Sequence, residues 1–262
     1  MSLFHISVFT EGKTAGRNED SILSNEHTVA LADGVTDKSG RDFNGKTGGE
    51  VASKIATETA LSSSATGQKL VDQISQNLTD SYRKYSQSAL KDSAYRIATT
   101  LLTVRIADNQ VIITQVGDCL LRVNGSEIYG QSKLIDTLAA SLRSQYIAET
   151  GDIRGSREVI MPLLKSQHIY RNNADHPLGF GAIDGSTVPS KFVSTFSLPL
   201  AELKTLELVS DGYYGAFPSE VSIEAYEKLH QKIQQTDPNK FKEYPSTKNN
   251  DDRTVAILTF TS

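Results

Sequence analysis

The chain has 262 residues, of which 38% are hydrophobic and 22% charged, a composition typical of a soluble globular protein. Lys and Arg number 27 and Asp and Glu 31, so the formal net charge is −4, which gives no electrostatic basis for binding nucleic acid or a membrane surface. No segment approaches the roughly 20 apolar residues of a membrane-spanning helix, and the N-terminus lacks a signal-peptide pattern. We expect a cytoplasmic monomer that binds neither nucleic acid nor membranes.

The cysteine and histidine content limits the kinds of metal site that are available. Cys119 is the only cysteine, so an internal disulfide and a zinc site built from cysteines are excluded. The five His are scattered along the sequence, which disfavours a His-rich site. Any metal must therefore be bound by carboxylates, which prefer hard cations such as Mg²⁺ or Mn²⁺.

In chain order, apolar β-like segments and helical patterns come in blocks rather than in strict alternation. The predicted strands span 3–9, 28–32, 98–107, 110–117, 119–124, 191–198, 205–210 and 254–260. The predicted helices span 48–61, 68–86, 131–149 and 219–235, the last beginning near Pro218 and Ser219. Asp108-Asn109 predicts a hairpin. Blocks of this kind favour an α+β fold over a doubly wound parallel sheet.

The organisation of the chain favours one domain over residues 1–262, since no repeat or linker is visible. Residues 150–190 are rich in Gly, Asn and Asp and predict a long loop, a feature that is usually functional or disordered inside a compact domain. This loop belongs to a helical and loop insertion over about 125–190, which we expect to border the functional site and to help select its substrate.

Five acidic clusters stand out, and four of them lie directly beside a predicted strand. The clusters are Asn18–Asp20, Ala32–Gly34, Val116–Asp118, Ser210–Gly212 and Asn250–Asp252. Taken singly, an Asp-Gly pair is an ordinary turn. Carboxylates gathered at one sheet edge would instead repel one another unless cations lay between them. Asp33, Asp211 and Asp251 could then hold two hard cations, and Gly34 would let a backbone carbonyl approach as a further ligand.

Seven short motifs occur in the order and approximate spacing of one known family. They are RNEDS, ALADGV, GGEVAS, ATTLLTV, VGDCLLRV, LVSDGYYG and DDRTVAIL. From about Ser7 to Phe260 the chain resembles the metal-dependent serine/threonine protein phosphatases of type 2C. The resemblance implies a four-layer αββα sandwich, in which two packed antiparallel β-sheets are flanked by helices. It also implies hydrolysis of phosphoserine and phosphothreonine in phosphoprotein substrates.

The resemblance assigns roles to individual residues. Asp33 would bridge two Mn²⁺ or Mg²⁺ ions, and Asp211 and Asp251 would complete the ligands of the first ion. The carbonyl of Gly34 would serve the second ion, with Glu19 acting nearby through water. A water bridging both ions would attack the phosphorus in line, without a phosphoenzyme intermediate.

The same resemblance bears on Asp20, Asp118 and Gly215, and it leaves Cys119 without a role. Asp20 would hold the metal ligands in position without binding an ion itself. Asp118 would belong to a third metal position that some family members have. Gly215 stands where those members carry an Asp, so the third position has one carboxylate fewer, and two ions are the expectation. Cys119 has no catalytic part and is predicted to be a small buried hydrophobe.

Besides Gly215, the chain departs from the family pattern at two positions. Where the family commonly has an Arg that binds the substrate phosphate, this chain has Ala15. Arg17 and Lys13 flank that position, and either could supply the cation, although a plain surface role fits each equally well. Many members carry a His after the first Asp-Gly, proposed to protonate the leaving oxygen, and here that residue is Val35. His176 is the only alternative visible, and a solvated loop position is its simpler interpretation.

Two other functions remain open. Gly40–Thr47 matches the phosphate-loop pattern G-x-x-x-x-G-K-[ST], which would make the protein a nucleotide hydrolase. That pattern should follow its strand at once and open directly into a helix, and here it does neither, so we interpret Lys46 and Thr47 as loop residues leading into a helix. The other alternative is a catalytically silent phosphatase-like domain that binds partners, which the presence of all three metal aspartates disfavours.

Overall fold

The structure is a computed structural model that describes residues 3–37 and 41–260. Within these residues the chain forms two five-stranded sheets, and every strand pairing is antiparallel. The first sheet, in spatial order, consists of β1 (Phe4–Glu11), β10 (Arg253–Phe260), β9 (Thr205–Val209), β6 (Leu120–Val123) and β7 (Glu127–Tyr129). The second consists of β2 (Asp20–Ser24), β3 (Thr28–Asp33), β4 (Leu101–Ala107), β5 (Gln110–Val116) and β8 (Ser194–Pro199).

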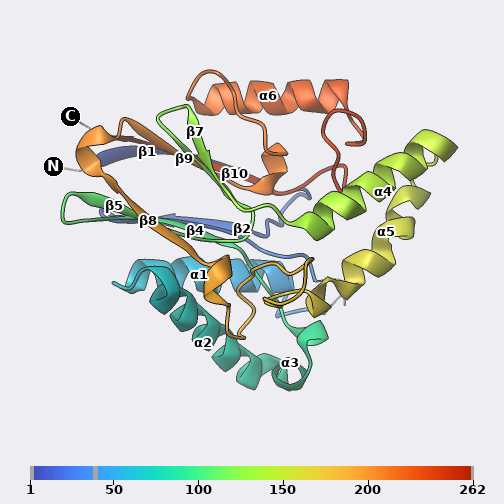
Figure 1. Ribbon diagram of the computed structural model, residues 1–262, viewed down its shortest axis with the longest axis horizontal. Coiled ribbons are helices and arrows are strands. Elements are labelled where there is room, and N and C mark those ends of the chain that lie inside the picture. The colour runs from blue at the N-terminus through green and yellow to red at the C-terminus, as the bar shows by residue number, and fades with distance from the viewer. Residues whose placement is uncertain (1–2, 38–40, 261–262) are drawn as a thin grey trace.

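Helices cover the outer faces of both sheets. They are α1 (Gly48–Ser62), α2 (Gly67–Tyr85), α3 (Gln87–Lys91), α4 (Leu134–Thr150), α5 (Gly155–Ser166) and α6 (Ile223–Thr236). Figure 1 shows α6 over the first sheet, α1 and α2 under the second, and α4 and α5 projecting beside the sandwich. This arrangement is the predicted α+β, four-layer αββα sandwich. Among the described residues, no helix is both long and apolar enough to cross a membrane.

The main hydrophobic core lies between the two sheets. Alternate residues of each strand face inward, so side chains from both sheets meet there, as in other sheet-on-sheet packings. The core includes Leu31, Val104 and Ile113 of the second sheet and Leu121, Leu208 and Leu258 of the first. Cys119 is fully buried in the same cluster, and burial raises the pKa of its thiol well above the ordinary value. The prediction that Cys119 is a buried hydrophobe is confirmed.

A second core joins α1 and α2 to the outer face of the second sheet. Small residues at helical spacing on α1, Ala52, Ala56 and Ala60, pack against Ala30 and Ala32 of β3. Because these side chains are small, the helix approaches the strand closely. The close contact brings the N-terminus of α1 to the end of β3, where the acidic cluster Ala32–Gly34 lies.

The insertion contains more helix than the sequence indicates. Residues 150–190 were expected to form a long loop, and that prediction is wrong for Gly155–Ser166, which forms α5. The internal Pro162 hides this helix, since proline is unfavourable in a helix interior. Packing stabilises it instead, because Ile160 and Leu164 are buried against Ala139 of α4.

Two local predictions concern the hairpin at Asp108-Asn109 and the start of the last helix. Asp108 and Asn109 have φ angles of 50° and 59°, as a tight two-residue hairpin between β4 and β5 requires, so the predicted hairpin is confirmed. The last helix does not begin near Pro218 and Ser219. Its N-cap is Ser222, whose side chain accepts a hydrogen bond from the backbone N–H of Ala225.

Candidate metal centre

Ends of strands from both sheets bring the acidic motifs together. Asp20 begins β2 and Asp33 ends β3, and the two residues are register partners. Asp211 lies two residues after the end of β9, and Asp251 lies two residues before β10. Asp118 lies in the short connection from β5 to β6. Residues more than 200 positions apart in the sequence therefore share one edge of the sandwich.

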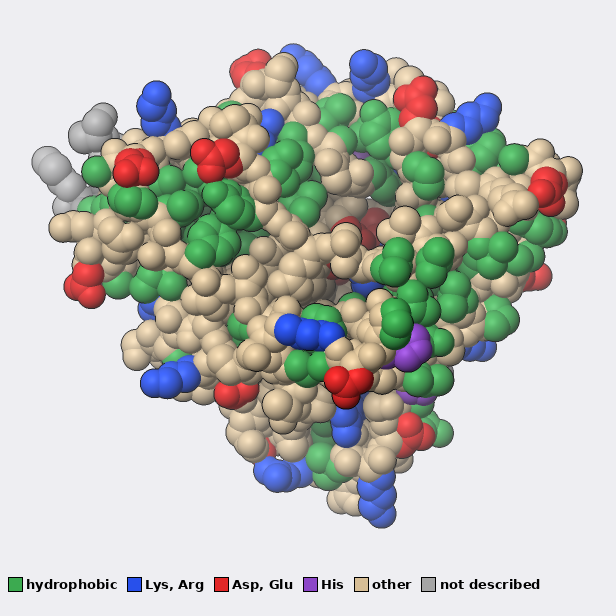
Figure 2. Space-filling model, viewed as in Figure 1, with side chains coloured by type: hydrophobic (Ala, Val, Ile, Leu, Met, Phe, Trp, Pro, Cys, Tyr) green, Lys and Arg blue, Asp and Glu red, His purple; other side chains and the backbone are tan. Residues whose placement is uncertain are grey.

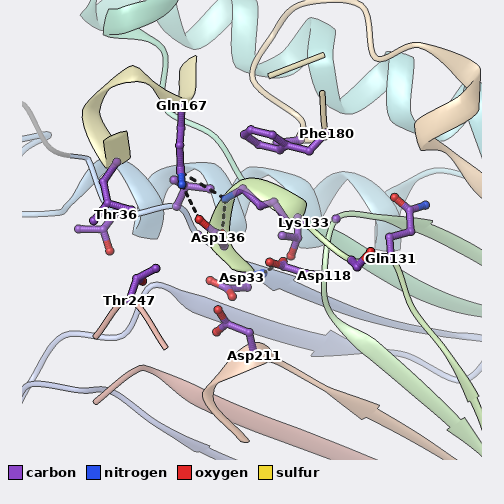
Figure 3. Close-up of a pocket in the computed structure, with 18 of the residues that line it drawn as sticks. Asp33, Thr36, Asp118, Gln131, Lys133, Asp136, Gln167, Phe180, Asp211 and Thr247 are labelled. Carbon is purple, nitrogen blue, oxygen red and sulfur yellow. Dashed lines mark hydrogen bonds and ion pairs between the residues drawn. The ribbon is translucent and has the colours of Figure 1, made fainter. Parts of the chain in front are cut away.

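Asp33, Asp118 and Asp211 point their carboxylates towards one another at this edge (Figure 3). On the outside, acidic side chains are visible at the bottom of a hollow in the molecular surface (Figure 2). Both Asp33 and Asp211 line a cavity there, together with Gly34 and Asp118. The structure thus places four predicted metal-site residues around one cavity.

Gly34 is required by the close approach of α1. Its N–H donates to the carbonyl of Glu19 at 3.0 Å, and a Cβ added at Gly34 would lie 2.3 Å from the carbonyl oxygen of Gly49. Any other residue would push the helix away. Glu19 is buried, and its carboxylate accepts a hydrogen bond of 2.7 Å from the hydroxyl of Thr47. The acidic cluster Asn18–Asp20 is in this way fixed beside the cluster Ala32–Gly34.

Burial and mutual repulsion make these carboxylates hard to ionise. Burial, with the nearby charges of Asp211 and Asp20, raises the pKa of Asp33 well above its ordinary value. Burial is also the main cause that raises the pKa of Asp211 and of Asp118. The pKa of Asp251 rises to about 7, through burial and the charge of Asp211. Ionised together, these groups would need positive charge between them.

Two carboxylate oxygens also have no hydrogen-bond donor. Within the described part of the chain, Oδ1 of Asp20 and Oδ1 of Asp211 are buried and accept no hydrogen bond. Buried polar atoms are nearly always paired, so the unpaired oxygen of Asp211, which lines the cavity, fits a cation ligand. The donor set consists of carboxylates and a backbone carbonyl, which is what Mg²⁺ and Mn²⁺ prefer. The residues present fit the predicted metal.

Two lysines that neutralise part of the acidic charge reach into the site. The ammonium of Lys13 lies 2.6 Å from Glu19, 2.9 Å from Asp252 and 3.9 Å from Asp251. Lys248 forms an ion pair with Asp251. Burial works against its charge, but the carboxylates, led by Asp251, raise the pKa of Lys248 well above its ordinary value.

The lysines affect how closely the acidic groups assemble. In the structure, residues 3–37 and 41–260 contain no group of three or more Asp, Glu, His or Cys side chains that is close enough together to hold one metal ion. Carboxylates repel, and Lys248 engages Asp251 while Lys13 engages Glu19. Metal binding would therefore require side chains to move, with the backbone already in place.

The opposite side of the cavity carries a third lysine that the sequence motifs do not reveal. Lys133, at the start of α4, lies 2.7 Å from Asp136 and places its ammonium 4.4 Å from the ring centroid of Phe180. Burial disfavours the charge, but Asp136 and Asp118 raise the pKa of Lys133. Gln167, which donates to Asp136, completes this wall. These residues come from the insertion, as expected of a segment that borders the site.

Three other positions were singled out by the sequence for binding phosphate or donating a proton. Arg17 is exposed in the turn between β1 and β2, so its phosphate-binding role stays a prediction. Val35 lines the cavity but carries no transferable proton. His176 is exposed, and its Nδ1 accepts a hydrogen bond of 3.0 Å from the N–H of Leu178. The simple loop interpretation of His176 therefore agrees with the structure.

The part of the phosphate-loop motif that the structure describes has a structural role. Gly40 lies outside the described residues. Thr47 is the N-cap of α1 and forms a capping box with Glu50, in which each side chain accepts from the backbone N–H of the other. Thr47 also donates its hydroxyl to Glu19. The interpretation of Thr47 as a residue leading into a helix is confirmed.

The chain matches the model of one known protein family. A model of protein phosphatase 2C matches residues 16–243. The chain belongs to the protein phosphatase 2C family. It is thus a protein-serine/threonine phosphatase, and membership of this family argues against the nucleotide-hydrolase alternative. No curated protein is significantly similar to it in sequence.

Solved phosphatase structures share the fold at low sequence identity. A bacterial serine phosphatase is 16% identical, over 99% of this chain and 98% of that one, with a TM-score of 0.58. Stp1 from Staphylococcus aureus, a serine/threonine phosphatase, is 18% identical over 100% and 98%, with a TM-score of 0.55. The catalytic domain of the phosphatase PstP, in complex with two manganese ions, is 16% identical over 99% of each chain, with a TM-score of 0.54. These likenesses confirm the predicted sandwich.

Proposed function

We propose that this phosphatase hydrolyses phosphoserine and phosphothreonine in protein substrates with two Mn²⁺ or Mg²⁺ ions bound at the acidic edge. One observation carries the proposal, namely the convergence on one cavity of three half-buried carboxylates with raised pKa, those of Asp33, Asp118 and Asp211. A cluster of this kind, in a cleft, is characteristic of a functional site. The structure of PstP with two manganese ions supports the choice of metal and the number of ions.

The ligands would come from both sheets. Asp33 would bridge the ions, Asp211 and Asp251 would bind one of them, and the carbonyl of Gly34, with Glu19 through water, would serve the other. When bound, the ions supply a water of lowered pKa as the nucleophile and offset charge on the phosphoryl group.

Asp20 and Asp118 would contribute to the metal site in addition to these ligands. Asp20 would hold the ligands in place through Ser210, whose hydroxyl donates to it. Asp118 faces the same cavity and is the residue available for a third ion. With Gly215 in place of a second carboxylate, we propose that two ions suffice.

The chain's own cations bind the phosphate group. Of the cations that line the cavity, which include Arg157 and Lys248, Lys133 is the one that we assign to the phosphate, and its ammonium would bind phosphoryl oxygens and orient the phosphorus towards the metal site. Lys13 and Arg17 remain the candidates that the sequence offers. Lys13 is already engaged by Glu19 and Asp252, so in its present position it balances charge within the site.

Phosphate release from a phosphothreonine peptide tests the proposal directly. We expect turnover with Mn²⁺ or Mg²⁺ that stops when EDTA is added and returns when metal is restored. A matched peptide carrying phosphotyrosine serves as the specificity control. Absence of turnover with every divalent metal, in a protein that is folded by circular dichroism, would favour the catalytically silent binding domain.

A further inference from the structure

Lys248 occupies an unusual position for a lysine. It lies in the loop before β10, three residues ahead of Asp251, and its ammonium forms an ion pair with the Oδ2 atom of that aspartate. The same side chain lines the cavity that contains Asp33 and Asp211. Its positive charge is therefore placed among the three aspartates to which the metal-binding role is assigned.

The backbone around Lys248 is fixed on both sides. The carbonyl of Thr247 accepts a hydrogen bond from Arg157 of α5, and the carbonyl of Asn249 accepts one of 3.0 Å from the hydroxyl of Tyr214. These bonds hold the Cα of Lys248 at the rim of the site. The long side chain, with its four-carbon stem, is the part that can move.

The electrostatic partners of Lys248 are the predicted metal ligands. Its charge interacts favourably with Asp251, Asp211 and Asp33, in that order. An exposed ion pair between residues three apart is usually worth little. Here a single ammonium acts on one buried carboxylate, that of Asp251, and on two half-buried ones, those of Asp33 and Asp211. Asp211 also retains a buried oxygen atom, Oδ1, without a hydrogen bond in the described residues.

Lys13 does not have the same arrangement. Its closest partners are Glu19 and Asp252, and Asp252 is not a predicted metal ligand. The backbone N–H of Lys13 also donates to Asp252 at 2.8 Å, so this lysine is bound to Asp252 through both main chain and side chain. Lys13 can keep its contact with Asp252 while ions bind, and its other partner, Glu19, is expected to act on an ion only through water. Lys248 cannot keep its contact, because its partner, Asp251, is expected to bind an ion directly.

We propose that Lys248 is an internal competitor for the metal. Its ammonium stabilises the cluster of Asp33, Asp211 and Asp251 in the metal-free protein, and it must withdraw from Asp251 before a divalent ion can bind there. The inference rests on the proposed two-ion function. Lys248 also lines a second cavity, between α4 and the loop 243–248, which gives the ammonium space to withdraw without movement of the backbone.

Removing the charge while keeping the length of the side chain tests this competition. For Lys248→Met we expect about tenfold tighter binding of Mn²⁺ by isothermal titration calorimetry, within the range usual for coupled binding events. We also expect a lower melting temperature in EDTA, since the carboxylates lose their cation. Lys248→Arg, which keeps a charge, should bind Mn²⁺ with an affinity close to that of the wild-type protein. Lys232→Met, which removes an exposed lysine from α6, is the matched control and should change neither quantity.

The outcomes separate this inference from the function on which it rests. Tighter Mn²⁺ binding by Lys248→Met together with reduced stability in EDTA supports the competition. Unchanged or weaker Mn²⁺ binding by a folded Lys248→Met protein overturns it and leaves the two-ion function standing. Failure of the wild-type protein itself to bind Mn²⁺ contradicts the two-ion function, and the inference falls with it.

Discussion

Ser210 donates a hydrogen bond of 2.8 Å to Asp20, and the two residues belong to different sheets. Ser210 follows β9 of the first sheet, and Asp20 begins β2 of the second. The hydroxyl of Ser210 also accepts from the N–H of Thr254, at 2.9 Å, in β10. One buried side chain therefore joins the two sheet edges at the point where Asp211 leaves the first sheet.

Ser210→Ala should loosen this junction. The substitution removes the donor to Asp20 and the acceptor for Thr254, so we expect a loss of about 1–3 kcal/mol in the free energy of unfolding, measured with urea. We also expect kcat/KM for a phosphothreonine peptide to fall, because Asp211 is the next residue. Ser62→Ala, at the exposed end of α1, controls for the loss of a hydroxyl. A mutant as stable as wild type would show that the bond contributes nothing at this edge.

Asp211→Asn should separate catalysis from folding. The change removes a predicted ligand, so metal-dependent phosphate release should disappear while the circular dichroism spectrum is kept. In EDTA the melting temperature should stay the same or rise, because burial and nearby carboxylates raise the pKa of Asp211, and the amide relieves that repulsion. Asp80→Asn, on the exposed side of α2, is the control. Full activity in Asp211→Asn would remove this residue from the metal site.

The acidic motifs that meet at the candidate metal site could be recognised from sequence because their pattern is local. Asp33 and Asp211 each follow an apolar strand and precede a glycine, and that combination is visible in a short window. The two-sheet fold was predictable through the same strands and the family motifs. Strand β2 was missed because it is short and its residues, Asp20–Ser24, include three polar side chains among five.

The cations of the site could not be predicted in the same way. Lys133 reaches the cavity only because α4 begins beside the sheet edge, and Lys248 reaches Asp251 only because its loop is hydrogen-bonded to Arg157 and Tyr214. Both lysines stand in stretches without a motif, and their positions depend on tertiary packing. Helix α5 was missed for a related reason, since contact with α4 stabilises it and local propensity does not.

The stability of the metal-free protein should depend on pH with a defined sign. Burial raises the pKa of Asp20 and of Asp251 to about 7, above the value near 4 expected in the unfolded chain. Between these values the native state binds more protons, so stability is full below about pH 4 and is lost as the pH rises towards 7. In EDTA, the melting temperature should therefore fall between pH 5 and pH 8.

Metal should reverse this trend, because the ligands must be deprotonated to bind it. With excess Mn²⁺ the melting temperature should rise over the same pH range. Differential scanning fluorimetry at constant ionic strength measures both series. A metal-free protein that becomes more stable with increasing pH would contradict the raised pKa values of the two aspartates.

Lys133→Met should affect substrate binding more than Arg17→Ala does. Lys133 faces the cavity, whereas Arg17 is exposed in a turn, so loss of the first cation should raise KM for a phosphothreonine peptide by about tenfold. Asp136 loses its ion pair in this variant, so Lys133→Arg, which keeps the charge, tests whether charge or packing matters. If Arg17→Ala raises KM and Lys133→Met does not, Arg17 and not Lys133 binds the substrate phosphate.

The buried ion pair between Arg122 and Glu207 lies on the other face of the first sheet, under α6. The two residues are register partners on β6 and β9, joined by a hydrogen bond of 2.7 Å, and both are almost fully buried. The hydroxyl of Tyr226 donates to Glu207, and Arg122 donates to the carbonyl of Pro218 at 2.6 Å. Every charged group here has partners, so the pair fixes how α6 and its preceding loop sit on the sheet.

Arg122→Met should cost about 3–5 kcal/mol of unfolding free energy, because it leaves the carboxylate of Glu207 buried with no opposite charge. Adding Glu207→Gln should recover much of that loss, since the amide carries no charge and still accepts the hydrogen bond from Tyr226. Urea unfolding of the two single variants and the double variant completes a double-mutant cycle. If the two substitutions are additive, so that Glu207→Gln costs as much in the Arg122→Met background as it does alone, the two side chains act independently. The ion pair then does not hold α6 in place.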